Sequence, residues 1–418
     1  MRIEILCTGD EILTGKTINT NYGHIARRLV ELGLNVHWGT TVGDDRASLR
    51  AAFAEAAARA DAVIVNGGLG PTVDDLSQEI AAEAAGVPLV LHEAWLARME
   101  GFYARRGRVM PPNNRKQAML PEGAEFIDNP IGTACGFAVT IGKARFFFTP
   151  GVPREMKRML EEQLIPRLLA QGGLPGVTRL KRFHSFGIGE SRADAMLSDI
   201  PGLDGPVKLG FQSHYPQLET KLAVRAADAA ELEGLLGPIE AEVRRRLGNF
   251  VLAEDDASLE SVILDALRAQ GGTLAVAEMF TSGNIAARLA PMPAAEGLFL
   301  RGLVAPGLAQ LGASLGIPAP GAVTPEAAAT TARALRADSG ASHALAVLIA
   351  LDAGADRQDW GGTLCIGIAT QAAVVTRQAR LMGGRDWVRL GAAELGLDCL
   401  RRHLLGLPVE ERVDFEQR

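Results

Sequence analysis

The stretch Ala62-Val63-Ile64-Val65-Asn66-Gly67-Gly68-Leu69-Gly70-Pro71 joins an uninterrupted apolar run to a glycine-rich turn. A strand without polar interruption is typical of a sheet that helices cover on both faces. Upstream, residues 3–6 and 36–42 predict two more strands, and the alanine-rich residues 46–60 predict a helix. This alternation of strands and helices predicts an α/β domain with a parallel sheet.

The rest of this domain follows from local patterns. Residues 91–108 have helical spacing, and a hairpin is expected for residues 136–148, with its turn at Gly142-Lys143. A helix over residues 153–171 ends the domain, so we place the first domain at residues 1–172.

Two further domains are expected. Residues 177–254 predict a small α+β linking domain, with a helix opening near Gly189, strands near Val207 and Leu222, and a final helix over residues 229–247. Residues 257–418 begin with a helix (258–270) and a strand (273–277), and continue with alanine-rich helices around the apolar runs 345–351 and 363–368. They predict a third α/β domain, and the charged tail after Leu407 is expected to be frayed.

Composition limits the function classes. The 418 residues carry a formal net charge of −6, so direct binding to nucleic acid is not expected. The four cysteines lie far apart, which favours reduced thiols and a cytoplasmic protein. The N-terminus has no leader pattern, and no stretch reaches the ~18 apolar residues that a membrane span needs.

The glycine turn carries the strongest chemical signal. Glycines between a strand and a helix let backbone N–H groups approach an anion, and the helix start attracts negative charge. Asp74 and Asp75 follow at once, and two carboxylates beside a phosphate would repel it unless a cation intervened. The turn therefore predicts a divalent metal, although both aspartates could instead cap the helix.

Other motifs also carry polar groups in turns. Thr8-Gly9-Asp10-Glu11 ends the first strand, and Asn19-Thr20-Asn21 opens the next helix, where ordinary turn chemistry is the alternative. Pro112-Asn113-Asn114-Arg115-Lys116-Gln117 suits the phosphates and base of a nucleotide, or is a solvated loop. Residues 129–133 and 149–156 are rigid turns after strands.

In this order, the five motifs of residues 1–170 resemble the N-terminal domain of the CinA family, the competence and damage-inducible proteins. The resemblance implies a three-layer molybdopterin-binding-like fold that hydrolyses ADP-ribose to AMP and ribose 5-phosphate with Mg²⁺, Mn²⁺ or Co²⁺. It also implies a small linking domain and a C-terminal nicotinamide-mononucleotide deamidase domain.

The resemblance also assigns roles. Gly67, Gly68, Gly70 and Thr72 would hold the pyrophosphate, Lys116 and Arg115 would offset charge, and Asn114 and Gln117 would contact the ribose or base. The catalytic residues implied are Asp10, Glu11, Asp74, Asp75 and Lys116, with Asp10, Asp74 and Asp75 as metal ligands. The substrate-binding residues implied are Asn19, Asn21, Gly67, Gly68, Gly70, Pro71, Thr72, Asn114, Arg115, Gln117, Asn129, Gly132, Thr133, Gly151 and Glu155. Which carboxylate activates water stays open.

The C-terminal domain departs from the family pattern. Deamidases of the family carry Ala-Glu-Ser-Cys-Thr-Gly-Gly with a serine nucleophile, and this chain has Ala277-Glu278-Met279-Phe280-Thr281-Ser282-Gly283. A thioether cannot act as that nucleophile. The family's tyrosine and lysine align with Pro306 and Leu311, and the glycine-rich loop is altered in residues 348–356. We therefore expect a folded domain, dimerising or ligand-binding, without deamidase activity.

Two alternatives remain. The chain could be a non-enzymatic adaptor that binds a nucleotide, molybdopterin or a DNA-repair protein, as the family's competence label suggests. The deamidase could also survive through an unexpected nucleophile, Ser282 or Thr281. The retained carboxylates argue against the first alternative, and the need for a nearby base argues against the second. A homodimer is expected in either case.

Overall fold

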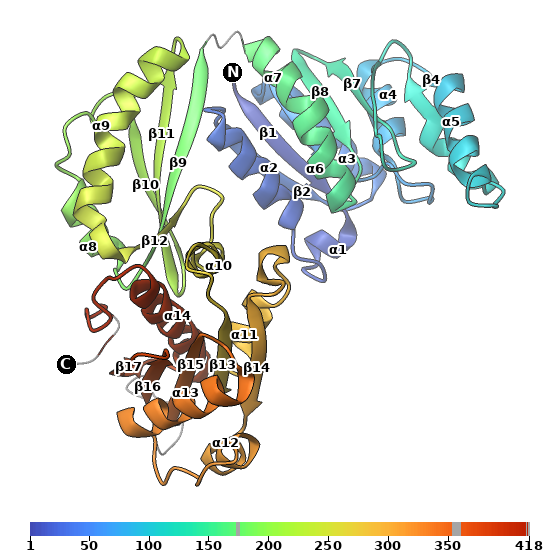
Figure 1. The fold of residues 1–418 in the computed structure, drawn as a ribbon. Helices are drawn as coiled ribbons and strands as arrows, with labels where there is room; N and C mark the ends of the chain where they lie inside the picture. The colour runs from blue at the N-terminus through green and yellow to red at the C-terminus, as the bar shows by residue number, and fades with distance from the viewer. Residues whose placement is uncertain (173–175, 353–360, 415, 417–418) are drawn as a thin grey trace. The chain divides into compact units, whose positions relative to one another are not determined.

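The computed structural model describes residues 1–172, 176–352, 361–414 and 416, and the chain forms two compact units. The first unit contains residues 1–179 and 225–229. The second contains residues 180–224 and 230–418. Each unit is described by itself, and Figure 1 shows the elements with their labels. Among the described residues, every helix is too short or too polar to cross a membrane.

The first unit is built on a six-stranded sheet in the order β2-β1-β3-β8-β7-β6. Four strands are parallel, and β7 and β8 form the predicted antiparallel hairpin, which is confirmed. The strands are β1 (Ile3–Thr8), β2 (Val36–Val42), β3 (Ala62–Asn66), β6 (Glu125–Ile127), β7 (Gly136–Ile141) and β8 (Ala144–Thr149). The α/β fold class is therefore confirmed.

Helices cover both faces of this sheet (Figure 1). On one face, Val63 and Val65 of β3 pack in an apolar cluster with Phe53, and on the other face Ile64 packs in a cluster with Ile25. This explains why β3 is apolar at every position except its last residue. The helices are α1 (Asp10–Leu13), α2 (Thr20–Glu31), α3 (Arg46–Arg59), α4 (Ser77–Ala85), α5 (Glu93–Ala104), α6 (Pro153–Met159), a π-helical turn (Leu160–Leu164) and α7 (Ile165–Gly172).

The prediction of one helix over residues 91–108 is wrong at both ends. Residues Leu89–Leu91 form strand β4, which pairs with β5 (Met119–Pro121), and α5 begins only at Glu93. The ring of His92 accepts a hydrogen bond from the backbone N–H of Trp95, so a histidine caps this helix. Residues Pro112–Ala118 form a 3₁₀ helix, η1, instead of an open loop.

The middle segment is a four-stranded sheet in the order β10-β11-β9-β12. Its strands are β9 (Val177–Phe186), β10 (Lys208–His214), β11 (Gln217–Ala226) and β12 (Val251–Glu254), and its helices are α8 (Glu190–Leu197), α9 (Ala229–Leu247) and η3 (Gly248–Phe250). Alternate residues of β11 are buried, so one face of this sheet packs on a core and the other is more open.

The last segment is a five-stranded sheet in the order β14-β13-β15-β16-β17. Its strands are β13 (Leu274–Met279), β14 (Phe299–Ala305), β15 (His343–Leu351), β16 (Gly361–Ala369) and β17 (Val374–Met382). Its helices are α10 (Leu259–Ala269), α11 (Asn284–Leu289), η4 (Pro293–Ala295), α12 (Leu308–Leu315), α13 (Pro325–Ser339) and α14 (Arg385–Leu404). The apolar runs 345–351 and 363–368 are the paired strands β15 and β16.

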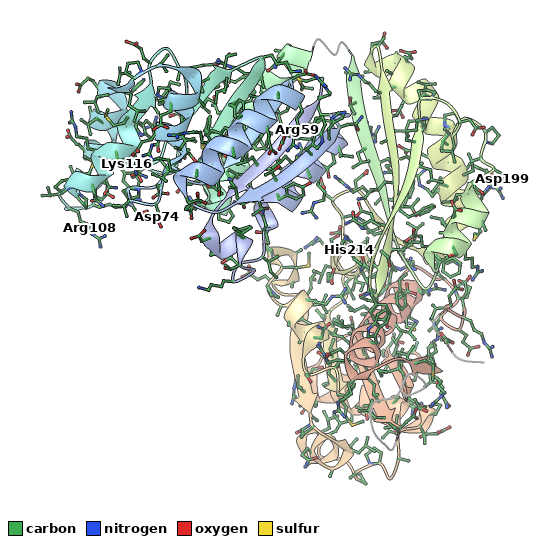
Figure 2. The ribbon with its side chains drawn as sticks, turned by 180° about the vertical axis from the view of Figure 1, so that it is seen from behind. Arg59, Asp74, Arg108, Lys116, Asp199 and His214 are labelled. Atoms are coloured by element: carbon green, nitrogen blue, oxygen red, sulfur yellow. The ribbon has the colours of Figure 1, made fainter. Side chains whose placement is uncertain are left out.

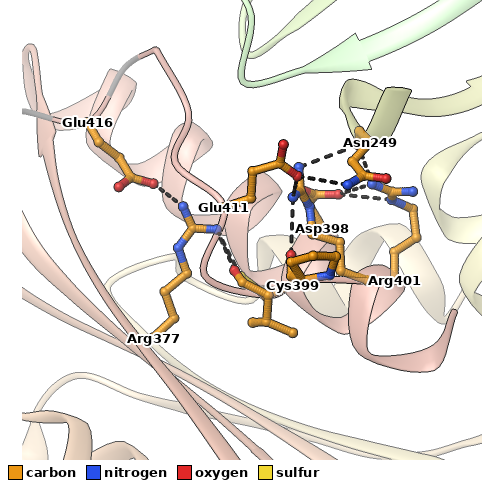
Figure 3. Close-up of polar contacts among 10 residues, drawn as sticks. Asn249, Arg377, Asp398, Cys399, Arg401, Glu411 and Glu416 are labelled. Carbon is orange, nitrogen blue, oxygen red and sulfur yellow. Dashed lines mark hydrogen bonds and ion pairs between the residues drawn. The ribbon is translucent and has the colours of Figure 1, made fainter. Parts of the chain in front are cut away.

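The expectation of a frayed tail is wrong for its described residues. Val409 and Val413 are buried, and Arg377 donates a hydrogen bond to the carbonyl of Val409 over 2.9 Å (Figure 3). Glu411 pairs with the fully buried Arg402, which also pairs with Asp398. The acidic side chains of the tail hold it in place because they neutralise buried arginines. The composition of the tail, rich in Glu and Arg, does not reveal these pairs.

Candidate active site

A cavity of about 510 Å³ opens at the carboxyl ends of the parallel strands of the first unit. This is the edge where open α/β sheets bind their ligands. The cavity is lined by Thr8, Gly9, Glu11, Asp44, Gly67, Gly68, Leu69, Gly70, Pro71, Asp74, Asp75, Gln117, Thr133, Ala134, Pro150, Gly151, Val152 and Glu155. The lining brings together the turns after β1, β2, β3 and β8, the segment between β6 and β7, and Gln117 of η1.

The glycine turn forms one wall. Gly67 and Gly68 have φ values of 113° and 69°, which other residues rarely adopt. A Cβ at Gly67 would lie 2.6 Å from Thr8 Oγ1, and one at Gly68 would meet the Ser77 hydroxyl. In the described part of the chain, the backbone N–H groups of Gly68, Leu69 and Gly70 have no acceptor. The turn therefore offers three donors to an anion.

Asp74 and Asp75 differ in their surroundings. Asp75 accepts hydrogen bonds from the backbone N–H of Thr72, over 2.9 Å, and from the Thr72 hydroxyl, so it holds the turn in shape. Asp74 is exposed, and hydrogen bonding from Thr72 followed by the charge of Lys116 lowers the pKa of its carboxyl. Figure 2 labels Asp74 and Lys116 at the same end of the domain.

Asp44 is the acidic residue that sequence reasoning missed. Its backbone N–H donates to Asp10 Oδ1 over 3.2 Å, and the N–H of Asp10 donates to Asp44 Oδ2 over 3.0 Å. Burial raises the pKa of Asp44, and the charges of Asp10, Glu11 and Asp74 raise it further, against the hydrogen bond from Asp10. Its position directly after β2, at the same sheet edge, could have identified it.

The carboxylates that line the cavity suit a divalent cation that prefers oxygen ligands. Among the described residues, no three His, Cys, Asp or Glu side chains stand close enough together to hold a metal ion by themselves. Four carboxylates, those of Glu11, Asp44, Asp74 and Asp75, nevertheless line the same cavity. Mg²⁺ is commonly held by one or two carboxylates together with water and phosphate oxygens, so this set of oxygen donors fits it. Asp10 does not line the cavity and instead holds the turn of Asp44.

The residues of η1 take different positions from those their sequence suggests. Asn114 is buried, does not line the cavity, and donates to the Tyr103 hydroxyl and to Gln117 Oε1. Gln117 lines the cavity and donates to the carbonyl of Leu69 over 3.3 Å. Lys116 Nζ lies 2.9 Å from the carbonyl oxygen of Thr72 and 3.6 Å from Glu79, while Arg115 is exposed. Neither cation lines the cavity, but Lys116 is tied to its glycine turn.

The remaining predicted residues line the cavity, support its lining or line a second pocket. Asn129 is fully buried and donates to Glu155 Oε2 over 2.7 Å, and its own oxygen accepts from the N–H of Gly132. Thr133, Gly151 and Glu155 line the cavity, whereas Thr72, Asn129 and Gly132 do not. Asn19 caps α2, and both Asn19 and Asn21 line a smaller neighbouring pocket.

In the last segment, Met279 and Leu311 are the positions at which the sequence predicts deamidase groups to be missing. Met279 and Leu311 belong to one buried apolar cluster. Glu278 is fully buried and accepts hydrogen bonds from the Thr281 hydroxyl and from the N–H groups of Ile285 and Ala286. The Ser282 hydroxyl donates to the carbonyl of Phe280 over 3.2 Å. Of the altered loop 348–356, residues 353–356 lie outside the described residues.

Comparison with known proteins covers nearly the whole chain. The sequence matches a probable molybdopterin binding domain over residues 4–170, a damage-inducible protein CinA KH domain over residues 180–253, and a CinA C-terminal domain over residues 256–404.

Full-length relatives are also similar to this chain. A CinA-like protein of Shewanella sediminis (strain HAW-EB3) is 39% identical over 97% of this chain and 96% of its own length. A CinA-like protein of Geobacter sulfurreducens is 38% identical over 97% of this chain and 100% of its own length. The solved structure of a CinA protein of unknown function from Thermoplasma acidophilum is 34% identical over 40% of this chain and 96% of that one, with a TM-score of 0.37. The chain belongs to the CinA-like protein family.

Proposed function

We propose that the first domain, residues 1–172, hydrolyses ADP-ribose to AMP and ribose 5-phosphate with a divalent metal. The observation that carries this proposal is that one cavity brings together free backbone N–H groups and carboxylates. The glycine turn offers the N–H groups of Gly68, Leu69 and Gly70, and the same cavity is lined by carboxylates that a pyrophosphate tolerates only with a cation between them.

The residues of the site would divide the reaction between them. The glycine turn would bind phosphate oxygens, and Lys116 would place positive charge beside this turn. A bound divalent cation would offset the charge of the pyrophosphate and lower the pKa of a water molecule. Glu11 and Asp44 line the cavity without bonding to the glycine turn, so they are the carboxylates best suited to accept the proton of that water.

The reaction balances without a covalent intermediate. Oxygen from water forms a bond to one phosphorus, and the bond from that phosphorus to the bridging oxygen breaks. The bridging oxygen leaves with the other phosphate, and the proton of the attacking water passes through a carboxylate to solvent. Both products are phosphate monoesters.

We also propose that the C-terminal domain has no deamidase activity and serves in a cytoplasmic homodimer. A cluster that contains Met279 and Leu311 leaves no hydroxyl or amine at those two positions. The adaptor alternative, with nucleotide or molybdopterin binding but no turnover, is disfavoured because Glu11, Asp44, Asp74 and Asp75 all line the cavity.

The test is release of AMP from ADP-ribose by the full chain with Mg²⁺, Mn²⁺ or Co²⁺. Wild type should release AMP, Asp74→Asn should lose most of this activity, and Asp194→Asn on the exposed surface of α8 should keep it. Absence of AMP with all three metals, in folded protein, would contradict the proposal. Tight ADP-ribose binding without hydrolysis would favour the adaptor.

A further inference from the structure

A second, smaller pocket adjoins the main cavity of the first domain. Its volume is about 150 Å³, and it shares Thr8, Glu11 and Gly151 with the main cavity. Asn21 and Asn66 are among its other lining residues. A ligand that binds in the main cavity can therefore extend one end past Thr8 into a separate compartment.

Two buried oxygen atoms of this pocket's lining residues have no partner. Thr8 Oγ1 and Asn21 Oδ1 form no hydrogen bond with any residue that the structure describes. The two residues are only 7% and 8% exposed. An unpaired buried polar atom is costly, and most such atoms in proteins are paired. Two of them in neighbouring lining residues point to a missing donor.

The amide of Asn21 is fixed in the orientation that leaves its oxygen unpaired. Its nitrogen donates to Asn66 Oδ1 over 2.9 Å and to the carbonyl of Gly151 over 2.7 Å. Asn66 is itself fixed, because its nitrogen donates to the carbonyl of Pro150 over 2.8 Å. Turning either amide over would set two acceptors against each other. The Asn21 oxygen can therefore only accept a hydrogen bond, and no described residue donates one to it.

We infer that the small pocket binds a hydroxyl-bearing group, the terminal ribose of ADP-ribose, and that Thr8 and Asn21 accept hydrogen bonds from its hydroxyls. This rests on the proposed function, since it names the part of that substrate which the pocket selects. A phosphate is disfavoured, because it brings acceptors and negative charge to a pocket lined by Glu11 and by an Asn21 oxygen that can only accept. Sugar hydroxyls can donate to both oxygens.

Thr8→Val isolates this contact. Valine has the shape of threonine, and Thr8 Oγ1 has no described protein partner to lose, so the folded state should keep its thermal midpoint. Thr8→Ser restores a hydroxyl. Thr220→Val is the matched control, because Thr220 Oγ1 is also buried and unpartnered but lies in β11, outside both pockets.

The experiment is calorimetric titration of the full chain with ADP-ribose and, separately, with ADP, which lacks the terminal ribose, both with Mg²⁺ and with every variant made in an Asp74→Asn background that slows hydrolysis. We expect Thr8→Val to weaken ADP-ribose binding about fivefold, as loss of one neutral hydrogen bond does, and to leave ADP binding unchanged. Thr8→Ser and Thr220→Val should leave both unchanged.

The outcomes separate the two proposals. Unchanged ADP-ribose affinity in Thr8→Val, equal weakening of ADP, or failure of the Asp74→Asn parent to bind ADP-ribose more tightly than ADP would overturn the inference. The proposed function is tested separately by AMP release. Selective weakening without AMP release in the presence of metal would uphold the pocket assignment and reject the hydrolysis.

Discussion

The backbone N–H groups of Asp10 and Asp44 each donate to the other residue's carboxylate, over 3.0 and 3.2 Å. This reciprocal pair joins the turn after β1 to the turn after β2. It places Asp44 in the wall of the main cavity while Asp10 stays outside it. Burial raises the pKa of Asp44, and the charges of Asp10, Glu11 and Asp74 raise it further.

The raised pKa of Asp44 predicts how the stability of the protein changes with pH. Between the unfolded and folded pKa values of Asp44, the folded protein holds a proton that the unfolded chain has lost, so this residue makes stability fall as pH rises. Asp44→Asn removes that titration and keeps an oxygen for the N–H of Asp10. The thermal midpoint of the variant minus that of wild type should therefore increase from about pH 3 to about pH 7.

The neighbouring residue provides a control of opposite sign. Hydrogen bonding from Ser48 lowers the pKa of Asp45, so its contribution to stability is lost as pH falls. For Asp45→Asn, the thermal midpoint of the variant minus that of wild type should decrease as pH rises. Parallel trends in the two variants would contradict the assignment of Asp44 to a buried, negatively charged site.

A second prediction concerns the apolar cluster of the C-terminal domain. Met279→Ser would leave a cavity beside Leu311 and bury a hydroxyl, and should lower the free energy of unfolding by about 2–5 kcal/mol. Met279→Leu conserves volume and should lower it by less than about 1.5 kcal/mol. Urea denaturation measures both. Release of ammonia from nicotinamide mononucleotide by wild type or by Met279→Ser would show that the site still functions.

A third prediction concerns the buried ion cluster of α14 and the tail. Asp398 is fully buried and accepts hydrogen bonds from Arg401 and Arg402, as Figure 3 shows for Arg401. Asp398→Ala leaves buried guanidinium groups with less compensating charge and should lower the free energy of unfolding by about 3–5 kcal/mol. Asp386→Ala, which breaks an exposed ion pair with Arg389, should change it by less than about 0.5 kcal/mol. Equal effects would mean that the buried cluster adds no stability.

Sequence patterns predicted the strands better than the side-chain contacts. The apolar runs identified β1, β3 and the β7–β8 hairpin because burial on two faces leaves few polar positions in a strand; Glu4 of β1 is one, and it pairs with Arg59. The strand β4 was missed because only three residues pair with β5, too few for an alternating pattern. His92 is an uncommon helix cap, so the start of α5 could not be predicted from its residue type.

Only part of the candidate site could be predicted from the sequence. The glycine turn could be found because its φ values demand glycine, and a run of glycines is visible in a sequence. Asp44 lies in a Gly-Asp-Asp turn that resembles ordinary loop sequence, and only the parallel order of β1 and β2 brings it to the cavity. The oxygens of Thr8 and Asn21 lack partners because of how distant segments pack around them, and local sequence does not reveal that packing.

Comparing AMP release by variants of two glycines beside α4 distinguishes a role of the glycine turn in hydrolysis from backbone strain. Gly68 and Gly86 have similar φ values, 69° and 72°, but a Cβ at Gly68 would meet the Ser77 hydroxyl, whereas one at Gly86 would meet nothing within 4 Å. Alanine at either position should cause similar backbone strain. With ADP-ribose and Mg²⁺, Mn²⁺ or Co²⁺, Gly86→Ala should release AMP within about twofold of wild type. Gly68→Ala should lose at least about 100-fold, because the clash of its Cβ with Ser77 moves the N–H donors of the turn away from the phosphate. Equal rates in the two variants, or no AMP from wild type, would contradict the account.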